Sequence, residues 1–567
     1  MKVLTSWSSL LAATALYQGV AVSALTKEDW RRQTIYQVLT DRFARSDGST
    51  TAPCDVADEA YCGGTWRGIA QRLDYIQGLG ATAVWISPIV KNIQGQTADG
   101  DSYHGYWAQD IYSLNHHFGT AEDLMALADA VHARGMYLMA DVVTNHMAWH
   151  GRSNTVNFST FRPFSNASAY HMPPCVIDYE DQETVEKCWQ GSDSVSLPDL
   201  RTEDPYVRQI FNAWIKHMVR KFKFDGLRLD SAKHVEKSFW PAFESSAGVF
   251  AIGEVLHGDP VYVTPYQDFM SGVMNYPAYY WITQAFQSTT GSIYNLSDGI
   301  KRLALAARDL TLYGSFLENH DQSRFPHYTK DRALLKNALT FTLLMDGIPI
   351  IYQGQEQGLS GGDRMPLNRE ALWLTGYNTQ SELYQWVSKF VALRSTMATL
   401  DHRYLFYTAL PVLTVDHVIA MRKGFDDNQV VSVYSNFGSN STCNGNCSVS
   451  LGTTETGFRP CKLVLEVVKC RLYVTDSNGV LRAQIESGEP LVFVPAERVM
   501  GTGICAGGIG KPPPPPPPPV HRKPSPTTSA SAQYSTTRLA FETTDYNLDS
   551  IGRFNNITSS PCLLSQP

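Results

Sequence analysis

Hydrophobic positions between about Lys27 and Gly354 fall into short continuous runs that alternate with longer helical patterns. The continuous runs, which are candidate strands, are TIYQVLTD, AVWISP, MYLMADVV, GLRLD, FAIGE, GVMNY, SFLENHD and IPIIYQG. Between them, apolar residues recur three or four positions apart, which places them on one face of a helix. One expected helix carries Ile69, Leu73 and Ile76 and ends at Gly80, a second carries Leu124, Leu127 and Val131, and a third runs from Val207 to Phe222.

This alternation predicts the fold class. Apolar strands separated by helices indicate a parallel sheet whose two faces are covered. Eight such units would close an α/β structure, the (β/α)8 or TIM barrel. A doubly wound open sheet is the alternative, but no GxGxxG turn follows the first strand.

The third unit of the pattern is interrupted. Residues 147–203 are rich in Ser, Asn, Pro and aromatic residues and show no clear periodicity before a helix begins near Asp204. A segment of this length predicts a functional loop or a small inserted domain after strand 3. At the carboxyl-terminal face of a barrel it would form one wall of a cleft. The expected barrel therefore comprises residues 25–146 and 204–400.

A different pattern follows the barrel. Residues 401–505 contain the short alternating runs VIAMRKG, QVVSVYSN, KLVLEVV, CRLYVTD and EPLVFVP, which predict a C-terminal antiparallel β-sandwich domain. Residues 506–530 hold a proline run followed by Ser and Thr, which is typical of an extended linker. The pattern assigns no role to the tail, residues 531–567.

The N-terminus has the features of a secretory signal peptide over residues 1–24. Lys2 precedes an apolar stretch that ends near Val22, and Val22-Ser23-Ala24 is a suitable cleavage site. A membrane anchor is the competing interpretation, but Ser, Thr and Gln interrupt the stretch. No other run is long enough to span a bilayer. We therefore expect a secreted, extracellular protein without a transmembrane segment in the mature chain, with cell-wall association as a further option.

Cysteines and sequons agree with export. Ten cysteines in a secreted chain are expected to be largely paired. Cys54 and Cys62 bracket one short segment, and Cys175 and Cys188 bracket another; neither pair has the CxxC spacing of a zinc site. Asn-X-Ser/Thr sequons, which mark candidate glycosylation sites, begin at Asn157, Asn166, Asn295, Asn440, Asn446 and Asn556.

Charge and aromatic content indicate which classes of binding partner fit this chain. The formal net charge is −7, and no basic run suggests nucleic acid or anionic lipid. Aromatic residues make up 11% of the chain, which suits stacking on sugars, although buried core aromatics are the commoner use. A neutral polymer fits this balance.

Four acidic residues end apolar runs: Asp141, Asp230, Glu254 and Asp321. A single acid after a strand is usually a helix cap. Four together at the carboxyl ends of barrel strands would face one site, and two carboxyl groups across a glycosidic bond are what retaining hydrolysis needs. Cationic or potentially cationic residues flank them at His146, Arg228, Lys233, His234 and His320.

The contexts DVVTNH, GLRLDSAKH, IGEVLHG and FLENHD resemble the four signature regions of the α-amylase family of glycoside hydrolases. The segments DWRRQTIYQVLTDRFARSDGST, GYWAQDIYSLN, SVSLPDL and GIPIIYQGQEQ are similar to its fungal, Taka-amylase-type branch. The resemblance extends from about Lys27 to Cys505. It implies an α-amylase that hydrolyses internal α-1,4-glucosidic bonds in starch, glycogen or maltooligosaccharides with retention, acting as a monomer.

The resemblance also implies roles for individual residues. Asp230 would be the nucleophile, Glu254 the general acid/base, and Asp321 the carboxylate that binds sugar hydroxyls. Residues expected to contact or shape the substrate site are Tyr106, Trp107, His146, Arg228, Lys233, His234, Gly258, His320 and Arg369. A calcium ion, Ca2+, would be held by Asn145, Glu186, Asp199 and the carbonyl oxygen of His234, all oxygen donors.

The chain departs from the fungal pattern at several points. Ala251 stands where a cysteine is usual, and His257 stands where an Asp is usual. Cys470 and Cys505 match a family bridge, whereas Cys443, Cys447, Cys461 and Cys562 have no clear counterparts and allow three pairings. The substrate Asp expected near residues 361–368 has only Asp363 as a candidate.

Other functions stay open at this stage. A related fungal 4-α-glucanotransferase transfers α-glucan segments at the cell wall, but tends to lack the two site histidines that are present here, His146 and His320. A non-catalytic glucan-binding protein would lack at least one of the three site acids, and none is lost. An exo-acting α-glucosidase would need loops that close one end of the cleft.

Overall fold

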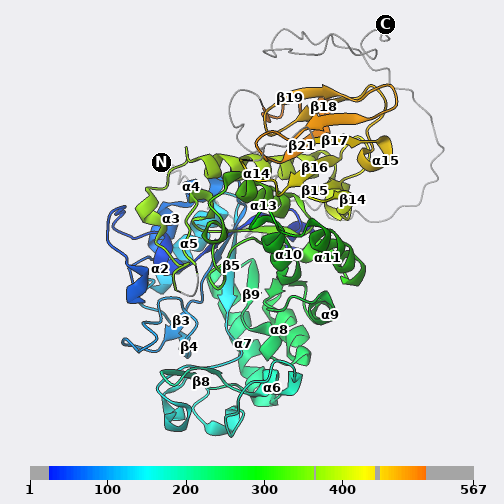
Figure 1. Ribbon diagram of the computed structural model, residues 1–567. Helices are drawn as coiled ribbons and strands as arrows, with labels where there is room; N and C mark the ends of the chain where they lie inside the picture. The colour runs from blue at the N-terminus through cyan, green and yellow to red at the C-terminus, as the bar shows by residue number, and fades with distance from the viewer. Residues whose placement is uncertain (1–24, 363–365, 441–446, 506–567) are drawn as a thin grey trace, which may run out of the picture.

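The computed structural model describes residues 25–362, 366–440 and 447–505. Its centre is an eight-stranded parallel sheet in the order β11-β10-β9-β5-β2-β1-β13-β12. Figure 1 labels two of these strands, β5 and β9, in the middle of the molecule. The strands are β1 (Ile35–Val38), β2 (Ala83–Ile86), β5 (Tyr137–Val142), β9 (Gly226–Leu229), β10 (Phe250–Gly253), β11 (Gly272–Val273), β12 (Gly314–Ser315) and β13 (Ile348–Tyr352). A parallel bridge between Met274 and Gly314 joins the two end strands, so the sheet closes into the predicted (β/α)8 barrel.

Both faces of the barrel strands are buried, which explains why they read as continuous apolar runs. Ile35, Met139 and Ile350 belong to the cluster that fills the barrel interior. Their chain neighbours Tyr36 and Leu138 pack instead against the surrounding helices. The main helices around the barrel are α3 (Trp66–Gln71), α4 (Leu73–Gly78), α5 (Ala121–His132), α7 (Pro205–Phe222), α8 (Trp240–Ala247), α10 (Tyr276–Phe286), α11 (Ile293–Ala306), α13 (Arg332–Leu344) and α14 (Glu382–Leu400).

One expected helix is divided in two. The prediction of a single helix through Ile69, Leu73 and Ile76 is wrong, because the backbone breaks at Arg72, with φ −116° and ψ 13°. The amide of Arg72 donates to the carbonyl of Ile69 at 3.0 Å, a tighter turn than that of an α-helix. The three apolar side chains still reach the core, and each is fully buried.

The interruption after the third barrel strand is a small folded unit. It contains helix α6 (Gln182–Lys187) and a three-stranded sheet of β6 (Trp149–His150), β8 (Val195–Leu197) and β7 (Gln190–Gly191). The Cys175–Cys188 disulfide closes one of its loops. This unit lies at the bottom of Figure 1, beyond the carboxyl end of β5.

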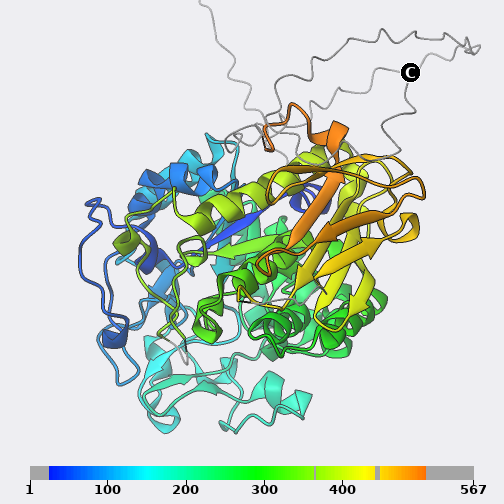
Figure 2. The same cartoon turned by 45° about the horizontal axis from the view of Figure 1, so that its top comes forward.

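The C-terminal domain is antiparallel, as predicted, and stands at the opposite end of the barrel, where Figure 2 shows its strands in yellow and orange. A six-stranded sheet runs β14-β15-β16-β21-β18-β19, and β17 pairs with β20. The strands are β14 (Leu410–Val415), β15 (Val418–Lys423), β16 (Val430–Ser435), β17 (Ser448–Leu451), β18 (Leu463–Glu466), β19 (Arg471–Val474), β20 (Leu481–Gln484) and β21 (Leu491–Pro495). Lys423 on β15 forms a buried ion pair with Asp346 of the barrel domain.

The disulfides and the remaining sequence features can be placed in part. Cys54–Cys62, Cys175–Cys188 and Cys470–Cys505 are each bonded. Cys447 and Cys461 each take part in a disulfide bond as well. None of the described helices is long and apolar enough to cross a membrane. The expected signal peptide, linker and tail lie outside the described residues, as do Cys443, Cys562, Asn446, Asn556 and Asp363.

Candidate active site

The strand-end acids meet because their strands are neighbours. Asp141 lies near the end of β5, Asp230 follows β9, and Glu254 follows β10; these three strands are adjacent in the sheet. Asp321 lies six residues beyond β12. Parallel strands present their carboxyl ends at one face, so the chain fold itself gathers these carboxylates.

Arg228 is the centre of the cluster. Its Nη1 donates to Asp230 Oδ1 at 2.7 Å and to Asp141 Oδ1 at 2.9 Å, and its Nη2 lies 3.1 Å from Glu254 Oε2. The Arg228 side chain is only 1% exposed. A buried guanidinium whose fork reaches three carboxylates fixes their relative positions.

Asp141 is the most enclosed acid of the group. It accepts hydrogen bonds from the Trp85 indole at 3.0 Å and from the Tyr106 hydroxyl at 2.7 Å. Burial, which Arg228 only partly offsets, raises the pKa of Asp141 to about 7. Its side chain has no exposed surface. These contacts fit an acid that supports the site rather than one that meets substrate.

Asp230, Glu254 and Asp321 form the reachable edge of the cluster. Their side chains retain 10%, 9% and 23% exposure, in contrast to the enclosed Asp141. Burial raises the pKa of Asp230, and the charge of Arg228 opposes that rise. Glu254 is held by the Ser231 amide at 3.0 Å and by the Tyr276 hydroxyl at 3.1 Å.

His320 and Arg369 flank Asp321. His320 Nε2 lies 3.2 Å from Asp321 Oδ2, while its Nδ1 contacts Gln37 Nε2 at 2.6 Å. The imidazole stacks on Tyr106 with ring centroids 5.1 Å apart. Arg369 Nη2 lies 3.4 Å from Asp321 Oδ1.

The other expected site residues lie around this group. His146 contacts the carbonyl oxygen of Tyr106 at 3.1 Å. Burial lowers the pKa values of both His146 and His320, so both imidazoles are neutral at ordinary pH. Trp107 packs edge-on against His104, with centroids 4.6 Å apart.

Two further residues expected at the substrate site, Lys233 and Gly258, lie beyond Glu254. Lys233 donates to the carbonyl of Leu256 at 3.1 Å and lies 4.6 Å above the ring of Tyr179. A Cβ atom at Gly258 would stand 3.2 Å from the Tyr280 ring, so a side chain there would crowd this region.

The expected calcium ligands lie at the junction of the inserted unit and the barrel. Residue 146, next to Asn145, forms a β-bridge with Asp199, and the Leu200 amide donates to the Asn145 carbonyl at 2.8 Å. The His234 ring contacts the carbonyl of Val185, next to Glu186, at 2.9 Å. Asp199 Oδ1 is buried and has no hydrogen-bond partner. Such an orphaned carboxylate oxygen fits a cation ligand.

The four expected calcium ligands are not all acidic side chains. Among the described residues, no three His, Cys, Asp or Glu side chains are arranged to hold a metal. The expected set has only two carboxylates, Glu186 and Asp199, and takes its other oxygens from an amide and a carbonyl. The donor chemistry suits calcium, which binds carboxylate, amide and carbonyl oxygens alike.

Several residues of the site escaped sequence reasoning. Trp85 and Gln37 come from β2 and β1, and Tyr276 opens α10. Gln37 offered a signal, since it is a polar residue inside the apolar run TIYQV. Trp85 and Tyr276 gave none, because each reads as a core aromatic until the barrel closes around it.

A closed (β/α)8 barrel whose strand ends carry clustered carboxylates has the features of a glycoside hydrolase. The family description "Alpha amylase, catalytic domain" matches residues 37–396, and "Alpha-amylase, domain C" matches residues 411–511. These matches cover most of the chain. The chain belongs to the α-amylase family.

Individual proteins agree with the family match. The chain is 46% identical over 511 residues to alpha-amylase 2 of Schwanniomyces occidentalis, covering 88% of this chain and 99% of that protein. It is 45% identical over 497 residues to an alpha-amylase of Saccharomycopsis fibuligera, covering 87% and 98%. The solved structure of an alpha-amylase from Malbranchea cinnamomea superposes with a TM-score of 0.81 at 47% identity, covering 85% of this chain and 100% of that one.

Proposed function

We propose that this protein is an α-amylase that hydrolyses internal α-1,4-glucosidic bonds of starch, glycogen and maltooligosaccharides with retention of configuration. The observation that carries the proposal is the bridging of Asp230 and Glu254 by the single guanidinium of Arg228. One guanidinium can contact both carboxylates only if they are close together. Two carboxylates that contact one guanidinium can lie at the separation of about 5 Å that retaining glycosidases use.

In this mechanism Asp230 attacks the anomeric carbon as Glu254 protonates the leaving oxygen, which forms a glycosyl-enzyme. Glu254, now ionised, takes a proton from water, which attacks the same carbon and releases the sugar with its original configuration. Arg228 keeps Asp230 ionised against the effect of burial. The Tyr276 hydroxyl and the Ser231 amide orient Glu254 between the two steps.

The remaining polar groups bind the sugar. Asp321 accepts hydrogen bonds from hydroxyls of the ring under attack, and the neutral His320 and His146 contact further hydroxyls. Tyr106, which stacks on His320, offers its other face to that ring. Trp107 lines the site close by, and Arg369 contacts both Asp321 and substrate. Lys233, His234 and the open space at Gly258 serve the sugars on the leaving side.

Calcium, in this proposal, has a structural role. Asn145, Glu186, Asp199 and the His234 carbonyl would hold it, which would tie the inserted unit to the barrel. The ion would bind Asp199 Oδ1, the oxygen of that carboxylate that does not pair with His171, while Asp230 and Glu254 carry the reaction.

We also propose that the protein is secreted and acts as a glycosylated monomer. Four of its sequon asparagines, Asn157, Asn166, Asn295 and Asn440, lie within the described residues, and all four are exposed. Exposed acceptor sites and several disulfides are typical of the secretory pathway.

The test is a product time course on maltoheptaose with wild type, Asp230→Asn and Asp298→Asn. Asp298 is an exposed acid on helix α11, remote from the site, and serves as the matched control. We expect shorter products from wild type and Asp298→Asn, and almost none from Asp230→Asn. Products longer than maltoheptaose would indicate the glucanotransferase alternative, which the names of the relatives do not favour.

A further inference from the structure

Arg42 is a fully buried arginine that no step of the proposed reaction uses. It belongs to the short helix α2 (Thr40–Phe43), which follows β1, and its side chain has no exposed surface. Its Nε donates to Asp41 Oδ2 at 2.9 Å. Burying a guanidinium costs free energy unless its N–H groups are hydrogen-bonded. The other contacts of Arg42 therefore indicate its role.

Arg42 reaches toward the site through two contacts. Its guanidinium lies 3.9 Å from the centre of the Tyr103 ring, and its Nη1 donates to the carbonyl of Arg369 at 3.4 Å. Tyr103 is itself 2% exposed. One buried cation therefore holds both a ring and a stretch of backbone.

Tyr103 and the backbone of residue 369 in turn position the guanidinium of Arg369 beside Asp321. Arg369 Nη1 lies 3.4 Å from the Tyr103 hydroxyl, and Arg369 Nε donates to the carbonyl of His320 at 2.9 Å. The third nitrogen of Arg369, Nη2, lies 3.4 Å from Asp321. The Arg369–Asp321 contact is long for a hydrogen bond, so a small displacement of the guanidinium would break it.

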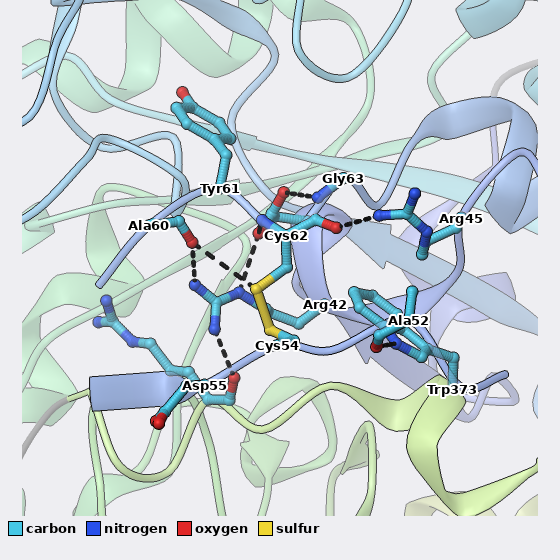
Figure 3. Close-up of a disulfide and its surroundings, with 12 residues drawn as sticks. Arg42, Arg45, Ala52, Cys54, Asp55, Ala60, Tyr61, Cys62, Gly63 and Trp373 are labelled. Atoms are coloured by element: carbon cyan, nitrogen blue, oxygen red, sulfur yellow. Dashed lines mark hydrogen bonds and ion pairs between the residues drawn. A yellow bond between two sulfur atoms is a disulfide. The ribbon is translucent and has the colours of Figure 1, made fainter. Parts of the chain in front are cut away.

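The disulfide loop holds Arg42 from the other side, as Figure 3 shows. Arg42 Nη2 donates to the carbonyl of Ala60, inside the loop that Cys54–Cys62 closes. Asp41 accepts the amides of Cys62 at 2.8 Å and Gly63 at 3.0 Å.

The same loop touches the segment that carries Tyr103. The Tyr61 hydroxyl donates to the carbonyl of Ser102 at 3.0 Å, and the Asp101 amide donates to the Glu59 carbonyl at 2.7 Å. Arg42 and Tyr103, two of the partners of Arg369, are thus anchored to the loop of residues 54–62, Arg42 directly and Tyr103 through its chain neighbours.

We propose that Arg42 is a positioning residue for the reaction. It fixes Arg369 through Tyr103 and through the Arg369 backbone, and Arg369 in turn holds Asp321. The Cys54–Cys62 loop keeps Arg42 in place. This inference rests on the proposed function, since it assigns Asp321 a role in binding the reacting sugar.

The test compares Arg42→Met and Tyr103→Phe with Arg45→Met. Arg45 also donates to the disulfide loop, at the Cys62 carbonyl, and in the described part of the chain its side-chain hydrogen bonds go to Asp47 and Cys62, so it is the matched control. We expect kcat on maltoheptaose to fall about 10- to 100-fold in Arg42→Met and about 3- to 10-fold in Tyr103→Phe, with KM changed less than threefold. Arg45→Met should keep kcat within twofold of wild type.

A double-mutant cycle separates positioning from a general loss of fold. In an Asp321→Asn background, Arg42→Met should lower the residual kcat less than twofold further, because the group that it positions is already disabled. Independent multiplication of the two effects would overturn the proposal. Equal loss of activity in Arg42→Met and Arg45→Met would overturn it as well.

Two further measurements keep the proposal testable if Arg42→Met does not fold or if the protein lacks the proposed activity. If Arg42→Met does not fold, Tyr103→Phe and the paired substitution Cys54→Ser, Cys62→Ser carry the same comparison, with kcat expected to fall in both. Hydrogen exchange of residues 319–324 needs no turnover. It should become faster in Tyr103→Phe and stay unchanged in Arg45→Met; unchanged exchange in both would refute the positioning role, whereas an inactive wild type would refute only the proposed function.

Discussion

Arg228 Nη1 lies 2.7 Å from Asp230 Oδ1, and Asp230 stands two positions after Arg228, directly beyond the end of strand β9. Alternate residues of a strand point to the same side, so the sequence R-L-D places the cation beside the nucleophile before any tertiary contact forms. The guanidinium then reaches Asp141 on the neighbouring strand β5 and Glu254 just beyond the neighbouring strand β10. Local register and barrel closure together build the charge balance of the site.

Replacing Arg228 by lysine tests this geometry. An ammonium keeps the charge but lacks the planar fork, so it cannot hold three carboxylates at once. We expect Arg228→Lys to lower kcat/KM by at least about 100-fold, the effect of misplacing groups by about 1 Å. Steady-state kinetics on maltoheptaose would measure it. Near-wild-type activity would show that charge alone is sufficient.

The pH profile tests the electrostatic role of the same arginine. The nucleophile acts only as the carboxylate, so activity falls as the pH drops through the pKa of Asp230. Burial raises that pKa and Arg228 opposes the rise. Removing the cation in Arg228→Met should therefore move the acid limb of kcat/KM to higher pH, by about one unit or more.

The matched control for that profile is Arg308→Met. Arg308 pairs with Asp268 on the surface, and its side chain is 65% exposed. Its removal should leave the acid limb where it is in wild type. An acid limb that moves to lower pH in Arg228→Met, or that moves equally in both variants, would contradict the assignment.

Most of the barrel could be predicted from the sequence because both faces of each strand are buried, and a continuous apolar run marks such a strand. The C-terminal domain was harder. The strands β14, β17 and β20 were missed: β17 and β20 are four residues long with every second residue exposed, and β14, at the sheet edge, has no fully buried residue. Short half-exposed strands bury too few apolar residues to stand out from loops.

The candidate site could likewise be predicted only in part. Acids at strand ends could be located from the chain alone, because strand order brings them to one face. Contacts across the barrel could not, since the pairing of Gln37 with His320 joins residues 283 positions apart. The break at Arg72 also carried no signal, because apolar spacing continues through it.

Calcium removal should weaken the fold. Asp199 Oδ2 pairs with His171 at 2.7 Å, but Asp199 Oδ1 is buried without a hydrogen-bond partner, so loss of a bound cation would leave that oxygen without a ligand. We expect a chelator to lower the thermal unfolding midpoint, and added Ca2+ to restore it better than Mg2+, which demands a tighter site. At a concentration 100 times its Kd, a ligand stabilises by about 2.7 kcal/mol.

Asp199→Asn provides the specific test of that site. Titration calorimetry should show weaker Ca2+ binding in this variant, and the chelator should then have little further effect on its unfolding midpoint. An exposed acid of the inserted unit, changed in Glu180→Gln, is the control and should bind as wild type does. A wild-type unfolding midpoint that does not respond to the chelator would contradict the proposed calcium site.

The ion pair between Lys423 and Asp346 should make the two large domains depend on each other. Both side chains are nearly inaccessible, at 6% and 2% exposure. Breaking a buried pair on one side leaves an unpaired charge, so Lys423→Met should lower stability by about 3–5 kcal/mol. Calorimetric unfolding would measure this loss.

The same measurement has an internal control. The double substitution Lys423→Met, Asp346→Leu should recover much of the lost stability, because no buried charge is left alone. Lys462→Met, which removes a pairing at the surface of the same domain, should cost less than about 1 kcal/mol. A larger loss in the double than in the single variant would contradict the explanation.

The central claim is that Asp230 and Glu254 act as a retaining pair. The most direct measurement is the proton NMR spectrum of products in the first minutes of maltoheptaose hydrolysis, before mutarotation mixes the anomers. The account predicts that new reducing ends appear first in the α configuration and that Glu254→Gln forms them at least about 100 times more slowly. New reducing ends that appear first in the β configuration would contradict it.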